Sequence, residues 1–361
     1  MKVPFLDLKR QYKQIKKEII PVITEICDSQ VFINGPRVKE LEENFANFCG
    51  TDYAVGCSSG TDALILSLLS LGIGEGDEVI TTPFTFFATI EAIIRVGAKP
   101  VLVDIEEDTY NIDYTKIKNS ITKKTKAIIP VHLFGQCSEI KEISKFGIPI
   151  IEDAAQAVGA QNYGLRAGSM GKLGCFSFFP TKNLGGFGDG GIVTTDDREL
   201  YEKMLVLRQH GIDPKERYFY KYLGGNFRLD ALQAGVINVK LKYISEWQEK
   251  RRQNAHYYNK SLKGVTLPKE NKDNYHVYNQ YVIRSEKRDV IKKHLLGKNV
   301  GCAIYYPYPL HLQPSVKFLG FKQGDFPICE KVCKEVLALP IYPEITKSEQ
   351  DAVMETIMEI L

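Results

Sequence analysis

The chain has 361 residues, more than one compact domain core usually holds, so two domains are expected. A hydrophobic content of 44% with 25% charged residues excludes a disordered or fibrous chain, and no apolar run of about eighteen residues could cross a membrane. The formal net charge is only +3 and the basic clusters are short, which argues against nucleic-acid binding.

The cysteines are scattered, and the start of the chain, MKVPFLDLKRQY, lacks the apolar core of a secretion signal. We therefore expect reduced cysteines and a cytoplasmic protein with no membrane partner. Cys329 and Cys333 lie four residues apart, but no second cysteine or histidine pair completes a metal site. No metal is predicted.

Strand-like and helix-like segments alternate over the first two thirds of the chain. A helical region ends at about residue 51, and apolar runs separated by helical stretches follow it. These runs cover residues 78–81, 100–104, 127–132, 148–151, 175–179 and 192–195. The alternation predicts an α/β fold with a mainly parallel sheet between helices, and ligands in such sheets bind beyond the carboxyl ends of the strands.

The pattern changes after about residue 240. A charged helix-like stretch covers residues 243–262, and a smaller region follows with two or three strands, including 277–284, and terminal helices. We therefore predict a large domain over residues 1–240, with the N-terminal segment included. A smaller C-terminal α/β domain is predicted over residues 241–361.

The first segment with chemical meaning reads GCSSGTDAL, from Gly56 to Leu64. Its small residues run directly into an apolar helix-like stretch, Ala63 to Leu71, and the free amides of a helix's first turn bind phosphate. On its own, an ordinary capped helix start is the simpler explanation.

Two strand-like runs end beside reactive side chains. The run 148–151 is followed by Asp153, while the run 175–179 contains Ser177 and is followed by a turn with Lys182. A pyridoxal phosphate (PLP) enzyme needs a lysine that makes a Schiff base with the aldehyde and an acid that holds the pyridinium nitrogen. Taken singly, the lysine is more simply a surface charge and the acid a helix cap.

The glycines that follow Lys182 satisfy GxGxxG, the dinucleotide fingerprint, from Gly186 to Gly191. That fingerprint must follow a strand and open a helix. Here the glycines run into the strand-like residues 192–195, so a turn after the lysine is predicted in place of a dinucleotide site.

Motifs spread over nearly the whole chain resemble one family in order and spacing. They read VPFLDLKRQY, GCSSGTDAL, GDEVITTPFTFFAT, PVHLFGQ, IIEDAAQAVGA, SFFPTKNLGGFGDGG, GGNFRLDALQA, YPYPLHLQP and LALPIYPEIT. The chain resembles the DegT/StrS family of PLP-dependent nucleotide-sugar aminotransferases, a branch of the fold-type I aminotransferases. The resemblance implies a seven-stranded-type sheet in the large domain.

The resemblance also implies the residues that hold the cofactor. Lys182 would form the Schiff base, Asp153 would pair with the pyridine nitrogen, and Phe86 would stack on the pyridine ring. Gln156 would contact the side of the ring that carries the hydroxyl. The phosphate would be held by Gly60, Thr61 and Ser177.

Three further residues follow from the same resemblance. Asn226 would reach the phosphate of the neighbouring subunit's cofactor, which implies a homodimer with active sites shared across the interface. His311 would lie near the sugar nucleotide, although a hydrogen-bonded loop histidine explains it as simply. Arg228 would support the carboxylate of the amino donor or brace its loop.

The implied reaction moves an amino group from an amino acid, glutamate in most of the family, to a nucleotide-linked keto-sugar, for surface glycan or related biosynthesis. Family members that aminate C-3 tend to carry Gln where this chain has Gln156, and those that aminate C-4 more often carry His, so C-3 is predicted and C-4 stays an alternative. Neither UDP nor dTDP is favoured by the sequence.

Three other functions compete with this prediction. Related sugar dehydratases place a histidine where this chain has Lys182, which argues against dehydration. A non-enzymatic regulatory protein on the same scaffold would be expected to lose Lys182 or Asp153, and both are present. An enzyme for free amino acids fits poorly with the VPFLDL and PYPLHLQP segments.

Overall fold

A continuous seven-stranded sheet forms the centre of the protein in a computed structural model that describes residues 1–361. Four strands pair in the order β1-β9-β8-β5 and three in the order β3-β2-β4, and parallel bridges from Ile128 to Ile150 and from Val131 to Asp153 join β4 to β5. Only β9 runs against the other six strands. The strands are β1 Tyr53–Cys57, β2 Glu78–Thr81, β3 Lys99–Leu102, β4 Thr125–Ile128, β5 Ile151–Asp153, β8 Leu173–Ser177 and β9 Gly191–Thr195.

The mainly parallel sheet predicted from the sequence is confirmed, with differences at its ends. Strand β1 was not among the predicted runs. The predicted run 127–132 ends earlier as a strand, at Ile128, and continues as extended chain bridged to β5.

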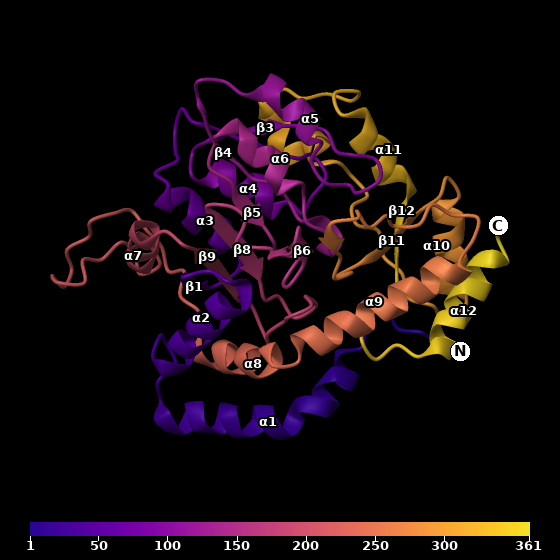
Figure 1. The fold of residues 1–361 in the computed structure, drawn as a ribbon, viewed down its shortest axis with the longest axis horizontal. Helices are drawn as coiled ribbons and strands as arrows, with labels where there is room; N and C mark the ends of the chain where they lie inside the picture. Colours follow the sequence, from indigo (N-terminus) through magenta and orange to yellow (C-terminus); the bar gives the residue numbers. More distant parts are fainter.

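Helices cover both faces of the sheet (Figure 1). Neighbouring residues of a strand point to opposite faces, so Cys175 packs into the core beside α3 while Phe176 packs into the core beside α2 and α8. The helices are α1 Leu8–Ser29, α2 Pro36–Cys49, α3 Gly60–Ser70, α4 Ala88–Arg95, α5 Tyr114–Ile117, α6 Ile140–Ile143, α7 Arg198–Leu207, α8 Ala231–Leu241, α9 Ile244–Ser261, α10 Arg288–Gly297, α11 Pro327–Glu335 and α12 Lys347–Met358.

The C-terminal part has its own core around two antiparallel strands, β11 Tyr281–Arg284 and β12 Val336–Leu339. The predicted strand 277–284 is shortened to β11. Val277 and Asn279 do not pair in a sheet, because they donate their backbone N–H groups to the carbonyls of Gly135 and Phe134 in the turn after β4. A small three-stranded sheet joins this part to the rest of the chain. Its strands are β6 Gln161–Asn162, β7 Leu165–Arg166 and β10 Asn274–Tyr275.

The first residues of the chain pack with the last third. Val3 is buried, bridges to Val300 in parallel, and belongs to the hydrophobic cluster of the C-terminal part. Helix α1, which follows, packs against α8 of the large part, and the assignment of the N-terminal segment to the large domain stays a prediction. The boundary at residues 240 and 241, between α8 and α9, stays a prediction.

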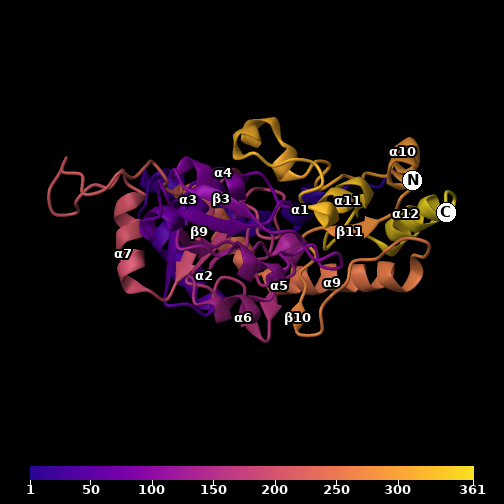
Figure 2. The ribbon, with the colours of Figure 1, turned by 90° about the horizontal axis from the view of Figure 1, so that it is seen from above.

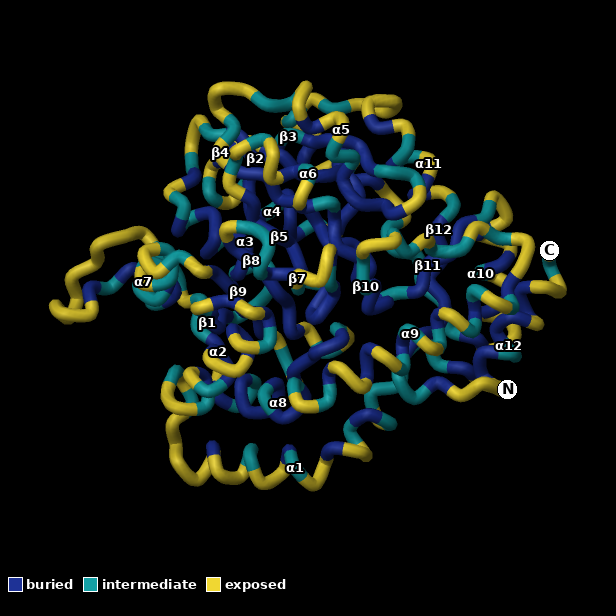
Figure 3. Tube along the Cα trace, viewed as in Figure 1, coloured by how far each residue is buried: buried dark blue, intermediate teal, exposed yellow.

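Both termini lie at one end of the molecule, and α7 with the loop after it lies at the other (Figures 1 and 2). That loop is largely exposed (Figure 3), and its exposed side chains include Tyr218, Phe219 and Leu223. None of the helices is both long and apolar enough to pass through a membrane.

Candidate active site at the carboxyl ends of the strands

A cavity of about 630 Å³ opens beyond the carboxyl ends of β1, β2, β5 and β8. The loops after these four strands supply most of its wall, as expected for an α/β sheet, and residues 304–306 close it from the C-terminal part. Its lining includes Ser59, Gly60, Thr61, Thr85, Phe86, Thr89, Asp153, Gln156, Ser177, Lys182, Gln280 and Tyr306.

The first turn of α3 and the end of β8 form one corner of the cavity. The side chain of Ser59 accepts the N–H of Asp62 at 3.0 Å and so caps α3, which begins at Gly60 rather than at Ala63 as the apolar pattern suggested. A Cβ atom on Gly60 would lie 2.7 Å from Cβ of Ser177. Glycine is therefore required for the helix to start this close to the serine, and the corner is suited to a phosphate.

Lys182 lies on the turn that follows β8. Its backbone N–H donates to the carbonyl of Phe179 at 2.9 Å, and a Cβ atom on Gly185 would lie 2.4 Å from the carbonyl oxygen of Pro180. The tight turn brings the lysine back over the cavity. Burial lowers the pKa of the Lys182 amine to about 8, so about a tenth of the amine is unprotonated at pH 7, far more than for an ordinary lysine.

Asp153 ends β5 and faces the same cavity. Its Oδ2 accepts the hydroxyl of Thr89 at 2.7 Å and its Oδ1 accepts the N–H of Ala155 at 3.3 Å. Burial raises the pKa of this carboxyl, while the Thr89 hydrogen bond and the nearby charge of Lys182 act in the opposite direction. A cationic partner in the cavity would favour the ionised form further.

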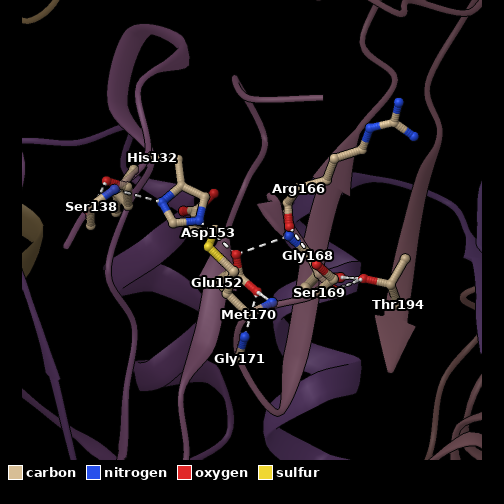
Figure 4. A network of polar contacts seen from close by, with 12 residues as sticks. His132, Ser138, Glu152, Asp153, Arg166, Gly168, Ser169, Met170, Gly171 and Thr194 are labelled. Carbon is tan, nitrogen blue, oxygen red and sulfur yellow. Dashed lines mark hydrogen bonds and ion pairs between the residues drawn. The ribbon is translucent and has the colours of Figure 1, made fainter. Parts of the chain in front are cut away.

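The neighbouring residue, Glu152, points to the other face of β5 and anchors the strand (Figure 4). Its carboxylate is fully buried and accepts the backbone N–H groups of Gly168, Met170 and Gly171 at 2.9, 2.8 and 2.6 Å. It also lies 2.8 Å from Nε2 of His132.

The tautomer of His132 follows from its second contact. The N–H of Ser138 donates to Nδ1 of His132 at 3.1 Å, so the imidazole hydrogen is on Nε2 and is donated to Glu152. The backbone N–H of His132 also donates to the carbonyl of Asp153 at 3.0 Å. The histidine thus ties the chain beyond β4 to the strand that carries Asp153.

We expect Glu152→Gln to reduce the free energy of unfolding by about 2–4 kcal/mol, because the amide cannot accept all four donors and leaves buried N–H groups unpaired. Urea denaturation measures the loss. Glu142→Gln, which removes an exposed pair with Lys145, is the matched control and should cost less than about 1 kcal/mol. Equal losses in the two variants would contradict the anchoring role.

Gln156 is held by protein groups at both ends of its amide. Its Oε1 accepts the N–H of Phe134 at 2.7 Å and its Nε2 donates to the hydroxyl of Tyr306 at 3.0 Å. One amide hydrogen of Gln156 and the hydroxyl hydrogen of Tyr306 remain available to a ligand. Burial raises the pKa of Tyr306, so this hydroxyl stays protonated.

Seven of the predicted site residues therefore line one cavity, and three do not. Asn226 is exposed on the chain between α7 and α8, and the adjoining Arg228 is partly buried. His311 is buried against Phe326, with Nε2 3.1 Å from Oε1 of Glu330. The seven that line the cavity are Gly60, Thr61, Phe86, Asp153, Gln156, Ser177 and Lys182.

Thr85, Thr89 and Tyr306 also line the cavity and were missed by the sequence analysis. The two threonines lie in the motif TPFTFFAT and the tyrosine is the first residue of YPYPLHLQP, so the resemblance had already marked both segments. The contact of Thr89 with Asp153 and that of Tyr306 with Gln156 join segments that are far apart in the chain.

Comparison with known proteins agrees with the geometry of this cavity, which brings a lysine, an acid and a phosphate corner together. The model of the DegT/DnrJ/EryC1/StrS aminotransferase family matches residues 13–358. The chain belongs to this family. Membership makes it a PLP-dependent aminotransferase of fold type I.

Relatives and solved structures of the family match over the full length. A "Pleiotropic regulatory protein" of Geobacillus stearothermophilus is 46% identical over 99% of this chain and 98% of its own. A UDP-N-acetyl-3-dehydro-alpha-D-glucosamine 3-aminotransferase of Acidithiobacillus ferrooxidans is 41% identical over 99% and 97%. The crystal structure of S. venezuelae DesV in complex with a ketimine intermediate is 38% identical over 99% and 98%, with a TM-score of 0.96.

The residues in the cavity fit this family's cofactor. The corner between Gly60 and Ser177 suits its phosphate, Lys182 its aldehyde and Asp153 its ring nitrogen. Phe86 is 60% exposed, so its ring is free to cover a second ring. The structure of NtdA from Bacillus subtilis, 34% identical with a TM-score of 0.91 over 99% of this chain and 85% of that one, has the bound cofactor PMP.

We expect the rate of PLP uptake by the apoprotein to rise about tenfold per pH unit up to about pH 8 and then to level off. Only the unprotonated amine attacks an aldehyde, and burial lowers the pKa of Lys182 to about 8. Stopped-flow absorbance measures the rate, and Lys182→Ala gives the background from non-covalent binding. A rate that still climbs towards the ordinary lysine pKa of 10.5 would contradict the lowered value.

Proposed function

We propose that this aminotransferase transfers an amino group from glutamate to C-3 of a nucleotide-linked keto-sugar, in the biosynthesis of an amino sugar. The observation that carries the proposal is the single cavity shared by Lys182, Asp153 and a phosphate corner. The Acidithiobacillus relative, whose name specifies a 3-dehydro sugar and a 3-aminotransferase, supports the C-3 position. Gln156, where C-4 enzymes more often have histidine, supports it from this chain.

The bound cofactor supplies an aldehyde that holds substrate amines covalently and a ring that takes up electrons. Nζ of Lys182 is the base that removes the proton from Cα of the amino donor, and burial keeps that amine partly unprotonated. The Asp153 carboxylate holds a proton on the ring nitrogen. Gly60, Thr61 and Ser177 bind the phosphate, and the free hydrogens of Gln156 and Tyr306 orient polar groups beside the ring.

A panel assay tests this function. Purified protein is incubated with glutamate and with UDP- and dTDP-linked 3-keto and 4-keto sugars, and the amino sugars are identified by NMR. Amination of a 3-keto sugar with release of 2-oxoglutarate is the expected result. Turnover of only a 4-keto sugar would overturn the assignment of C-3, and turnover with another amino acid would overturn glutamate.

A second candidate is a regulatory role without turnover, which the name of the Geobacillus relative favours. The two candidates differ in what glutamate does to the PLP-loaded protein. A transaminase converts its bound cofactor to the amino form when glutamate is added, and the absorbance changes accordingly. A purely regulatory protein leaves the spectrum unchanged with every amino acid donor.

We also propose that the active site is shared across a homodimer. Asn226 is exposed and lies outside this chain's own cavity, as a residue that serves a partner would. The loop between α7 and Asn226 is exposed as well, and its exposed side chains include Tyr218, Tyr220 and Leu223. Arg228 and His311 are proposed to act on the substrate, Arg228 at the donor carboxylate and His311 beside the sugar nucleotide.

Mixing an inactive variant with a strongly impaired one should restore activity if Asn226 acts in trans. Lys182→Ala and Asn226→Ala subunits are combined and allowed to exchange, and the heterodimer is isolated with two different tags. One of its sites then receives both defects and the other receives neither. We expect about half of the wild-type activity per heterodimer. A pure heterodimer without activity would place Asn226 at its own chain's cofactor.

A further inference from the structure

A chain of two buried hydroxyl groups leads to the carboxylate of Asp153. Oγ1 of Thr85 lies 3.0 Å from Oγ1 of Thr89, and Oγ1 of Thr89 lies 2.7 Å from Oδ2 of Asp153. All three residues are buried, with exposed fractions of 2%, 1% and 5%, and all three line the cavity. Phe86, proposed to cover the cofactor ring, lies between the two threonines in the sequence.

The direction of each hydrogen bond in this series follows from the negative charge of the Asp153 carboxylate. An ionised carboxylate only accepts, so the single hydroxyl hydrogen of Thr89 is donated to Asp153. Thr89 then accepts from Thr85. The competing acceptor for Thr89, the carbonyl of Phe86, lies farther away at 3.2 Å and carries no charge.

The two oxygens of Asp153 are consequently in different situations. Oδ2 is held by the short bond from Thr89, whereas Oδ1 has only the long bond of 3.3 Å from the N–H of Ala155. Oδ1 keeps acceptor capacity, and the rotation of the carboxylate about its Cβ–Cγ bond is limited by Thr89.

We propose that Thr89, supported by Thr85, is the positioning residue for Asp153: its hydroxyl fixes Oδ2 so that Oδ1 is presented to the protonated ring nitrogen of the cofactor. The hydrogen bond also favours the ionised carboxylate, which burial opposes. An ordinary helix threonine that bonds only the carbonyl three residues earlier would have no such effect. This inference rests on the proposed role of Asp153.

The test compares Thr89→Val, which keeps the shape and removes the hydroxyl, with Thr89→Ser, which keeps the hydroxyl. We expect Thr89→Val to lower kcat about 10- to 100-fold, the range for one hydrogen bond to a charged group, with little change in KM for the amino donor. Thr89→Ser should recover most of kcat. Thr82→Val, a buried threonine that does not line the cavity, controls for the loss of a hydroxyl nearby.

A spectroscopic measurement separates positioning from a structural role. The absorbance of the bound cofactor depends on the protonation of its ring nitrogen, so its spectrum and pH titration should change in Thr89→Val and revert in Thr89→Ser. Thermal unfolding of the holoenzyme is followed in parallel. Lower thermal stability with an unchanged spectrum and kcat would overturn the proposal.

The double variant decides whether Thr89 acts through Asp153. In an Asp153→Asn background, Thr89→Val should cause little further loss, because the carboxylate that it positions is gone. Full additivity of the two losses would overturn the inference. If Asp153→Asn alone leaves kcat and the spectrum unchanged, the proposed role of Asp153 fails; if it lowers kcat and Thr89→Val does not, only the present inference fails.

Discussion

Lys182→Ala should abolish transamination, with kcat reduced by at least about 10⁴-fold, the upper range for a lost general acid–base group. The variant loses the covalent attachment of the cofactor together with the base that moves the proton from Cα of the donor. No second lysine lines the cavity, so none can take over.

Two measurements check this result. The absorbance of the covalently bound cofactor should disappear, and the assay with glutamate and keto-sugar should show no product above background. Lys172→Ala is the matched control, because Lys172 is an exposed lysine paired with Asp197 outside the cavity, and it should keep wild-type turnover. Substantial catalysis by Lys182→Ala would remove this residue from the mechanism.

Asp153→Asn should lower kcat by about 10²–10³-fold, which corresponds to the loss of one well-placed electrostatic contact. Asparagine preserves the shape of the side chain but not the charge that keeps a proton on the ring nitrogen. The phosphate corner and Lys182 are unchanged, so the cofactor should still bind. The expected pattern is therefore a coloured protein with weak turnover.

Steady-state kinetics and equilibrium titration of the cofactor separate the two effects. Asp52→Asn, an exposed acid after α2, controls for the loss of a carboxylate and should not alter kcat. Wild-type turnover in Asp153→Asn would show that the ring nitrogen does not need this acid.

Local pattern was sufficient to predict the parts of the site that lie directly after strands. Asp153 ends β5 and Lys182 follows β8, and parallel strands bring their carboxyl ends to one edge of the sheet. The start of α3 was predicted three residues too late because its first turn is set by the cap at Ser59, a hydrogen bond that periodicity does not report.

Contacts between distant segments could not be read from local pattern. Tyr306 meets Gln156 across 150 positions of the chain, and Thr89 meets Asp153 across 64. The first contact depends on how the C-terminal part packs against the sheet, and the second on how α4 packs against it. The same holds for residues 277–279, whose apolar character predicted a strand although their backbone bonds the turn at Phe134 and Gly135.

The pairing of Val3 with Val300 has a consequence for the order in which the protein is made. At roughly 5–20 residues per second, a ribosome needs about 15–60 s to reach the partner of a residue that it added third. By then the residues of the large sheet, from Tyr53 to Thr195, have left the exit tunnel, while Val3 still lacks its partner. The C-terminal core around Val3 therefore closes late in synthesis, after Gly60, Asp153, Ser177 and Lys182 have all been added to the chain.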